Sequence, residues 1–236
     1  MDNVVVIMAG GLGKRMNSDI PKVLHKVNDK PMLIHVIESA LLIQPIKIYI
    51  VVGKYMPMIK DAVYFYNLID NVEFIKQEEA LGTGHAIQCC RPYLYQHEYS
   101  NTIILSGDVP LITTETIRKM IKDLDYARIL TTILDDPTGY GRVIESDTGK
   151  FEKIVEEKDC NDLERKCQKI NAGIYAFDTI TLCKYLPLLS NNNAQGEYYL
   201  TDIVEIIKTK EEVDIELYEM PKEKQIELTG VNTEQQ

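Results

Sequence analysis

The chain has no hydrophobic run long enough to cross a membrane. Nowhere in its 236 residues does an apolar stretch approach the roughly 20 consecutive residues of a transmembrane helix. Its first residues also lack a positively charged segment followed by an apolar core, which would mark a secretory signal. We therefore expect a cytoplasmic protein without a membrane partner.

Paired cysteines are missing as well. The number of cysteines is odd, no C-x-x-C motif occurs, and the five are Cys89, Cys90, Cys160, Cys167 and Cys183. Such a set predicts a reduced, cytosolic setting rather than a disulfide framework. Cys160 and Cys167 could be a metal pair, but no nearby residue completes a zinc set, so packing is the favoured interpretation.

An excess of positive charge is also absent. The formal net charge is -10 at pH 7, and the sequence pI is near 5.0. We expect no nucleic-acid partner, because nonspecific binding to a phosphate backbone depends on basic residues. A small anionic nucleotide can still bind where local cations and a metal ion offset the negative field.

Two common phosphate-binding loops are missing from the start of the chain. A Walker loop needs a glycine, four intervening residues and then Gly-Lys followed by Ser or Thr. Met8 stands where the first glycine belongs, and Arg15 replaces the hydroxyl residue after Gly13-Lys14. A G-x-G-x-x-G fingerprint beginning at Gly11 fails because Met16 occupies its third position. These departures disfavour a P-loop kinase and a nicotinamide-dependent dehydrogenase.

A different glycine-rich turn is present after an apolar run. Residues 4–7 are β-branched and apolar, as expected for a buried strand of a parallel sheet. Three glycines and two separated cations follow, namely Gly10, Gly11, Gly13, Arg15 and Lys22. Glycines let backbone N–H groups approach an anion closely, and the cations suit a polyphosphate. The pattern favours a nucleoside triphosphate site at the carboxyl edge of a sheet. The alternative is an ordinary turn between a strand and a helix.

Apolar runs and helical patterns alternate along the first half of the chain. Strands are predicted over 4–8, 46–52, 72–75 and 102–106, with helices over 32–43, 56–68, 82–94 and 113–124. Beyond residue 127, strands predominate over 128–134, 141–145, 151–155, 170–177 and 213–219, with helices over 179–189 and 200–208. We predict one α/β domain over residues 1–236, with a mixed, mostly parallel sheet flanked by helices.

Polar residues follow several predicted strands and are candidates for chemistry. Asp108 comes directly after a strand and a glycine, where a carboxylate could coordinate Mg²⁺ or form a turn. Gln77 and the segment Gly82-Thr83 could surround a planar base, or the segment could cap a helix. His85 invites the role of a general base, but a histidine in a first helical turn is more often structural.

The second half of the chain holds candidates for binding a sugar. Gly141 lies in a turn that either approaches a ligand or forms a hairpin. Glu156 ends a predicted strand and Asn171 begins another, so each could bind hydroxyl groups or lie on the surface. A polar loop over 191–202 precedes a helix, and Asn232 lies near the last residue.

The motifs occur in an order that resembles a known family. They are MAGGLGKRM, PKVLH, LGTGHA, GDVPL, DDPTGYGR, IVEEKD, NAGI, NNNAQGEYYLTD and GVN, and they cover nearly the whole chain. The sequence is similar to the uridyltransferase (pyrophosphorylase) domain of bacterial bifunctional N-acetylglucosamine-1-phosphate uridyltransferase. The resemblance implies a Rossmann-like nucleotidyltransferase fold. It also implies conversion of UTP and N-acetylglucosamine 1-phosphate to UDP-N-acetylglucosamine and pyrophosphate.

The resemblance also implies roles for individual residues. It assigns the nucleotide to Met8, Ala9, Gly10, Gly11, Gln77, Gly82 and Thr83. It assigns phosphate contacts and charge stabilisation to Arg15 and Lys22, and Mg²⁺ to Asp108 and Asn232. The amino-sugar pocket would be lined by Ser106, Gly107, Gly141, Glu156, Asn171, Tyr199 and Thr201.

The sequence departs from the family pattern in places. Lys14 stands where Thr or Ser is usual, and Ser106 where some members have Tyr. No hexapeptide repeat follows GVN, so we expect neither the acetyltransferase activity of the bifunctional members nor the trimer built by its β-helix. A naturally single-function protein and a trimmed form both fit. Two alternatives stay open: a pyrophosphorylase for another sugar 1-phosphate, such as glucose 1-phosphate, and a non-catalytic regulator that binds nucleotide sugars.

Overall fold

The computed structural model describes residues 1–11 and 20–229. Five positions named above lie outside these residues, namely Gly13, Lys14, Arg15, Met16 and Asn232. All five cysteines lie inside them, and each is a free thiol.

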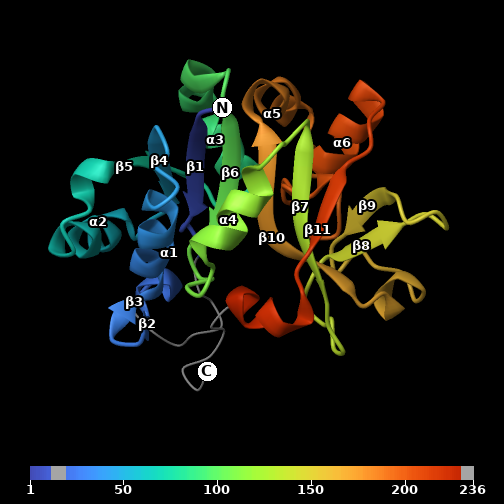
Figure 1. Cartoon of the computed structure of the whole chain (residues 1–236), viewed down its shortest axis with the longest axis horizontal. Coiled ribbons are helices and arrows are strands. Elements are labelled where there is room, and N and C mark those ends of the chain that lie inside the picture. The colour runs from blue at the N-terminus through green and yellow to red at the C-terminus, as the bar shows by residue number, and fades with distance from the viewer. Residues whose placement is uncertain (12–19, 230–236) are drawn as a thin grey trace.

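Parallel strands form one half of the main sheet (Figure 1). β1 (Asn3–Met8) pairs in parallel with β4 (Lys47–Val52) on one side and with β6 (Asn101–Ser106) on the other. β5 (Val72–Lys76) pairs in parallel with β4. Residues 4–7 have no exposed surface, because helices cover both faces of this half. A strand buried on both faces needs a continuous apolar run. The apolar run over residues 4–7 is the pattern from which β1 was predicted.

The other half of the sheet is mixed. β10 (Lys169–Asp178) runs antiparallel to both β6 and β7 (Ala127–Ile133), and β11 (Glu216–Glu219) pairs in parallel with β7. β8 (Arg142–Glu145) and β9 (Phe151–Val155) form an antiparallel hairpin attached to β10. The prediction of a mixed, mostly parallel sheet flanked by helices is therefore confirmed.

Helices cover the two faces of the sheet. One face carries α1 (Met32–Leu41), α2 (Met56–Phe65) and α4 (Thr114–Ile121), and the other carries α3 (Thr83–Leu94), α5 (Thr179–Tyr185) and α6 (Asp202–Glu211). Alternate residues of β1 supply the two cores, with Val5 and Ile7 on one face and Val4 and Val6 on the other. None of the described helices combines the length and the apolar composition needed to span a bilayer.

Short elements complete the described chain. A two-stranded sheet joins β2 (Lys26–Val27) and β3 (Lys30–Pro31). The 3₁₀ helices are η1 (Lys22–Leu24), η2 (Ile69–Asn71), η3 (Tyr95–His97), η4 (Glu164–Lys166), η5 (Leu186–Leu188) and η6 (Lys222–Leu228).

Four helices, α1, α2, α4 and α5, end earlier than the sequence predicts, and two of them show the reason. α2 ends at Phe65, and Asn67 takes a left-handed conformation with φ of 57°, which terminates helices. α5 ends at Tyr185 because Pro187 lacks the N–H that would continue the helix. The carbonyl of Cys183, four residues before Pro187, instead accepts a hydrogen bond of 2.8 Å from Arg91 Nε.

The carboxyl ends of the parallel strands are tied together by backbone hydrogen bonds. Gly107 N donates to Met8 O at 2.9 Å, and Ala9 N donates to Val51 O at 2.8 Å. Gln77 N donates to Val52 O, also at 2.8 Å. The turns that follow β1, β5 and β6 therefore begin along one edge of the sheet, where α/β folds bind ligands.

Candidate active site

A pocket of about 350 Å³ opens at this edge. It brings together seven of the residues singled out from the sequence, namely Met8, Thr83, Ser106, Asp108, Glu156, Asn171 and Thr201. The rest of its lining comes from Val109, Thr138, Gly139, Tyr140, Ala172, Gly173, Tyr175, Leu200 and Leu228. Residues from both halves of the sheet thus share one cavity.

A cation and a carboxylate meet where β6 ends. Lys22 Nζ lies 2.5 Å from Asp108 Oδ2, and the Ser106 hydroxyl donates to Asp108 Oδ1 at 2.6 Å. Gly107 lies between Ser106 and Asp108 in the sequence, and a Cβ on it would lie only 3.0 Å from Met8 O. A side chain at this position would therefore push the ends of β1 and β6 apart. This tight approach holds Asp108 beside the end of β1.

The donor set at Asp108 fits Mg²⁺. Mg²⁺ prefers oxygen ligands and is usually held by one or two carboxylates, with water and substrate phosphates completing its shell. Asp108 offers such a carboxylate, oriented by Ser106. In the described ranges, no group of three or more His, Cys, Asp or Glu residues could hold a metal ion.

The predicted nucleotide residues adjoin one another at the ends of β1 and β5. Gln77 Nε2 donates to Gly82 O at 3.1 Å, and a Cβ on Gly10 would lie 3.3 Å from Gln77 Oε1. Gly82 has φ of 111°, and a Cβ there would lie 2.5 Å from Tyr198 O, so only glycine fits. A Cβ on Gly11 would meet nothing within 4 Å.

Thr83 connects the nucleotide side to the polar loop before α6. Its Oγ1 accepts a hydrogen bond of 3.0 Å from Leu200 N. Thr83 was predicted to lie beside a base or to cap α3. The helix cap is instead Gly82, without a side-chain hydrogen bond, and the Thr83 hydroxyl holds the loop.

The predicted sugar residues also come together. Thr201 Oγ1 donates to Glu156 Oε1 at 3.0 Å, and a Cβ on Gly141 would lie 3.5 Å from both Glu156 carboxylate oxygens. Burial raises the pKa of the Glu156 carboxyl, and the hydrogen bond from Thr201 opposes that rise. Asn171 lies on β10, where its Nδ2 donates to the Tyr175 hydroxyl at 2.6 Å.

Tyr199, like the predicted sugar residues Gly107 and Gly141, is absent from the pocket lining. Its hydroxyl donates to Asp159 Oδ2 at 3.1 Å and accepts from Gln195 Nε2 at 2.9 Å. Burial, with the neighbouring Asp159 adding to the effect, raises the pKa of Tyr199 to about 12. Its hydroxyl therefore stays protonated and holds the loop together.

Sequence reasoning missed part of the pocket wall. Thr138, Gly139 and Tyr140 belong to the turn DDPTGYGR, but only Gly141 was singled out there. Tyr175 could have been found by strand periodicity, because it lies four residues beyond Asn171. Leu228, at the end of η6, carried no signal that linked it to the pocket.

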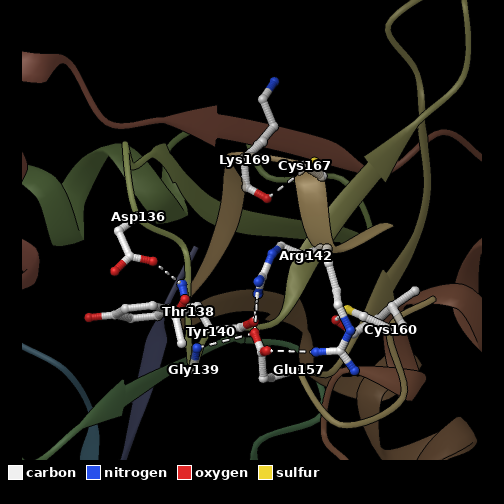
Figure 2. A network of polar contacts seen from close by, with 11 residues as sticks. Asp136, Thr138, Gly139, Tyr140, Arg142, Glu157, Cys160, Cys167 and Lys169 are labelled. Atoms are coloured by element: carbon white, nitrogen blue, oxygen red, sulfur yellow. Dashed lines mark hydrogen bonds and ion pairs between the residues drawn. The ribbon is translucent and has the colours of Figure 1, made fainter. Parts of the chain in front are cut away.

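A buried ion pair fixes this wall (Figure 2). Arg142, with only 2% of its side chain exposed, donates one guanidinium hydrogen bond to Tyr140 O and another, of 2.7 Å, to Glu157 Oε2. Gly139 N donates to the same Glu157 oxygen at 3.2 Å, and Arg165 lies 2.9 Å from the other oxygen. The Arg142 hydrogen bond, aided by Gly139, holds the pKa of Glu157 below its usual range. The pair therefore fixes residues 139–140 in the wall.

We predict that Glu157→Gln lowers the free energy of unfolding by about 2 kcal/mol, measured by urea denaturation. Breaking a fully buried pair costs about 3–5 kcal/mol, and we expect less because 27% of the Glu157 side chain is exposed. Glu73→Gln is the matched control, since it breaks a surface pair with Lys47 and should cost below about 1 kcal/mol. Equal losses in the two variants would contradict a stabilising role for the ion pair between Arg142 and Glu157.

Acidic groups lie behind the sugar side of the pocket. Burial raises the pKa of Asp202 to about 6, and repulsion from Glu156 and Glu205 adds to the shift. Asp202 begins α6, directly after Thr201. The fold therefore disfavours the ionised form of this carboxyl relative to the unfolded chain.

This shift predicts a pH dependence of stability. As pH rises from the unfolded pKa near 4 through the folded value of about 6, the unfolded chain ionises first, so Asp202 lowers the stability of the fold progressively. Asp202→Asn removes this titration. The stability of the wild type relative to the variant should fall between pH 4 and pH 6 and stay constant above pH 7, as measured by urea midpoints. Parallel pH curves would contradict the assignment.

Comparison with known proteins agrees with this architecture. A family model described as the MobA-like NTP transferase domain matches residues 5–153. A protein of Acanthamoeba polyphaga mimivirus, named "Probable UDP-N-acetylglucosamine pyrophosphorylase", is 39% identical over 236 residues, covering 98% of this chain and 92% of that protein. The "Bifunctional protein GlmU" of Clostridium botulinum (strain Loch Maree / Type A3) is 41% identical, covering 99% of this chain and 50% of GlmU. The chain thus spans about half the length of that bifunctional relative.

A solved structure shows the same fold. It is described as a glucose-1-phosphate thymidylyltransferase from Bacillus anthracis in complex with a sucrose. Its TM-score is 0.73 at 21% sequence identity, covering 93% of this chain and 87% of that chain. At this identity the likeness concerns the fold alone.

The family model and these relatives identify the chain as a nucleotidyltransferase, which is an enzyme. The chain belongs to the MobA-like NTP transferase family. The resemblance of its motifs to the pyrophosphorylase domain of the bifunctional bacterial enzymes is confirmed by the relatives that it matches.

Proposed function

We propose that the protein is a Mg²⁺-dependent uridylyltransferase. It makes UDP-N-acetylglucosamine and pyrophosphate from UTP and N-acetylglucosamine 1-phosphate. One observation carries the proposal. In the sheet order β5-β4-β1-β6-β10, Asp108 follows β6 and is paired with Lys22. Gln77 follows β5 on one side of this pair, and Asn171 lies on β10 on the other. A charged centre thus lies between a nucleotide side and a sugar side. The mimivirus relative, which is matched over 92% of its own length, is named for this activity.

The chemistry needs no protein nucleophile. A phosphate oxygen of the sugar phosphate attacks the α-phosphorus of UTP in line, and pyrophosphate leaves with the electrons of the broken bond. Catalysis then depends on positioning and on stabilising charge at the phosphates. Lys22 supplies a positive charge next to Asp108, and the resemblance assigns Arg15 to the leaving pyrophosphate. When bound by Asp108 and Asn232, Mg²⁺ supplies further neutralisation of phosphate charge.

The two substrates suit different ends of the site. Gln77 and the backbone around Gly82 offer amide groups for a base. Glu156 and Thr201 offer a carboxylate and a hydroxyl that can bond sugar hydroxyls. The free thiols fit the cytoplasm, which we propose as the location of the protein.

The decisive experiment measures pyrophosphate release by the purified chain. With UTP, N-acetylglucosamine 1-phosphate and Mg²⁺ we expect turnover, and we expect chelation by EDTA to abolish it. Glucose 1-phosphate tests the rival sugar, because equal kcat/KM values for both sugars would contradict selection of the acetamido group. Binding of UDP-N-acetylglucosamine without turnover of any substrate pair would identify a regulator instead.

Asp108→Ala tests the proposed metal role. The variant should fold, because Asp108 is half-buried at a strand end and its removal leaves the packed cores untouched. We expect turnover to fall at least on the order of 100-fold, the scale of losing one charge-stabilising group. The control is Asp178→Ala, which removes the cap of α5 at the opposite end of β10. A folded Asp108→Ala protein with wild-type, Mg²⁺-dependent rates would contradict the proposal.

A further inference from the structure

The Gln77 side chain is held in one orientation by two acceptors. Its Nε2 donates to Gly82 O and to His85 Nδ1, each at 3.1 Å. An amide nitrogen has two hydrogens, so these bonds use both of them. Gln77 Oε1 accepts no hydrogen bond from the described residues, and it faces Gly10, where a Cβ would lie 3.3 Å away. An oxygen therefore faces the glycine turn, while the nitrogen is turned away from it.

The surroundings of His85 favour the tautomer that accepts. The residue lies in the first turn of α3, with its ring 6.2 Å from that of Tyr198. Its Nε2 lies 3.9 Å from Cys89 Sγ, a weak acceptor that suits an N–H donor. With the proton on Nε2, Nδ1 has a lone pair available for the amide of Gln77.

We propose that His85 is a positioning residue that makes the site select uracil over cytosine by fixing the Gln77 amide. The N3 of uracil carries a hydrogen and donates, whereas the N3 of cytosine accepts. An amide that presents only oxygen bonds uracil at this position and repels cytosine. A rotated amide would present N–H groups and reverse the preference. The orientation of Gln77, as well as its presence, thus sets the choice of base. This inference rests on the proposed use of a uridine nucleotide.

The test compares the dissociation constants of UTP and CTP, measured by calorimetry without the sugar phosphate. His85→Leu removes the acceptor, and we expect the preference for UTP to fall about 3- to 10-fold, the scale of one hydrogen bond. The loss is partial because Gly82 O still holds the amide. His85→Gln supplies a carbonyl acceptor and should restore most of the preference. Thermal unfolding checks that each variant is folded, and His85→Ala replaces the leucine variant if that one is not.

The matched control is Gln88→Ala on the same helix, because the Gln88 amide bonds Leu186 O and the substitution leaves the bond between Gln77 and His85 in place. It should keep the wild-type preference for UTP. Equal weakening of UTP and CTP binding in His85→Leu would overturn the inference, because a purely structural role would affect both nucleotides alike. A wild type that binds the two nucleotides equally would overturn it too. Turnover plays no part in this readout, so failure of the proposed reaction is recognised separately in the pyrophosphate assay.

Discussion

The parallel pairing of β1 with a neighbour on each side is the constraint on which the site depends. Because β4 and β6 flank β1 in register, the three strands end together at one edge. Their backbone groups then bond across the edge, from Gly107 N to Met8 O and from Ala9 N to Val51 O. These bonds hold the strand ends together, so Asp108 lies beside the end of β1.

The antiparallel strand β10 adds the second half of the site. It runs against β6, so residues near its start lie at the edge where the parallel strands end. Its register against β7 shifts between Asn171 and Tyr175, where Gly173 has φ of 74°. Such a bulge redirects side chains at a strand end. Asn171, Gly173 and Tyr175 all line the pocket at this point.

Local sequence patterns predicted most elements, because buried parallel strands must be continuous apolar runs. Residues 4–8 and 102–106 match β1 and β6 to within one residue. The position of β10 between β6 and β7 was not predictable in this way, since it depends on contacts between residues distant in sequence. The role of Arg142 was missed for a similar reason. A charged residue in a glycine-rich turn usually indicates the surface, and only its packing against Glu157 shows that it is buried.

Sequence patterns place some of the predicted site residues better than others, for physical reasons. Asp108, Glu156 and Asn171 stand at strand ends, so strand prediction alone brings them to the sheet edge. The link between Gln77 and His85 depends on where a loop places a helix, which sequence spacing does not fix. Tyr199 was assigned to the sugar pocket only through the family resemblance, and in the structure its hydroxyl bonds Asp159 and Gln195.

The charges within the pocket account for how an acidic chain can bind anionic substrates. Lys22 offsets the charge of Asp108 where β6 ends, so that region is not dominated by negative charge. The end of the pocket at Glu156 is different, because burial raises the pKa values of Glu156 and Asp202, and repulsion from neighbouring carboxylates adds to both shifts. A phosphate placed there would meet further repulsion, whereas sugar hydroxyls can donate to carboxylates. Under the proposed function, the electrostatics favour a sugar phosphate whose phosphate lies toward Lys22 and whose ring lies toward Glu156, which is the orientation that an attack on UTP would require.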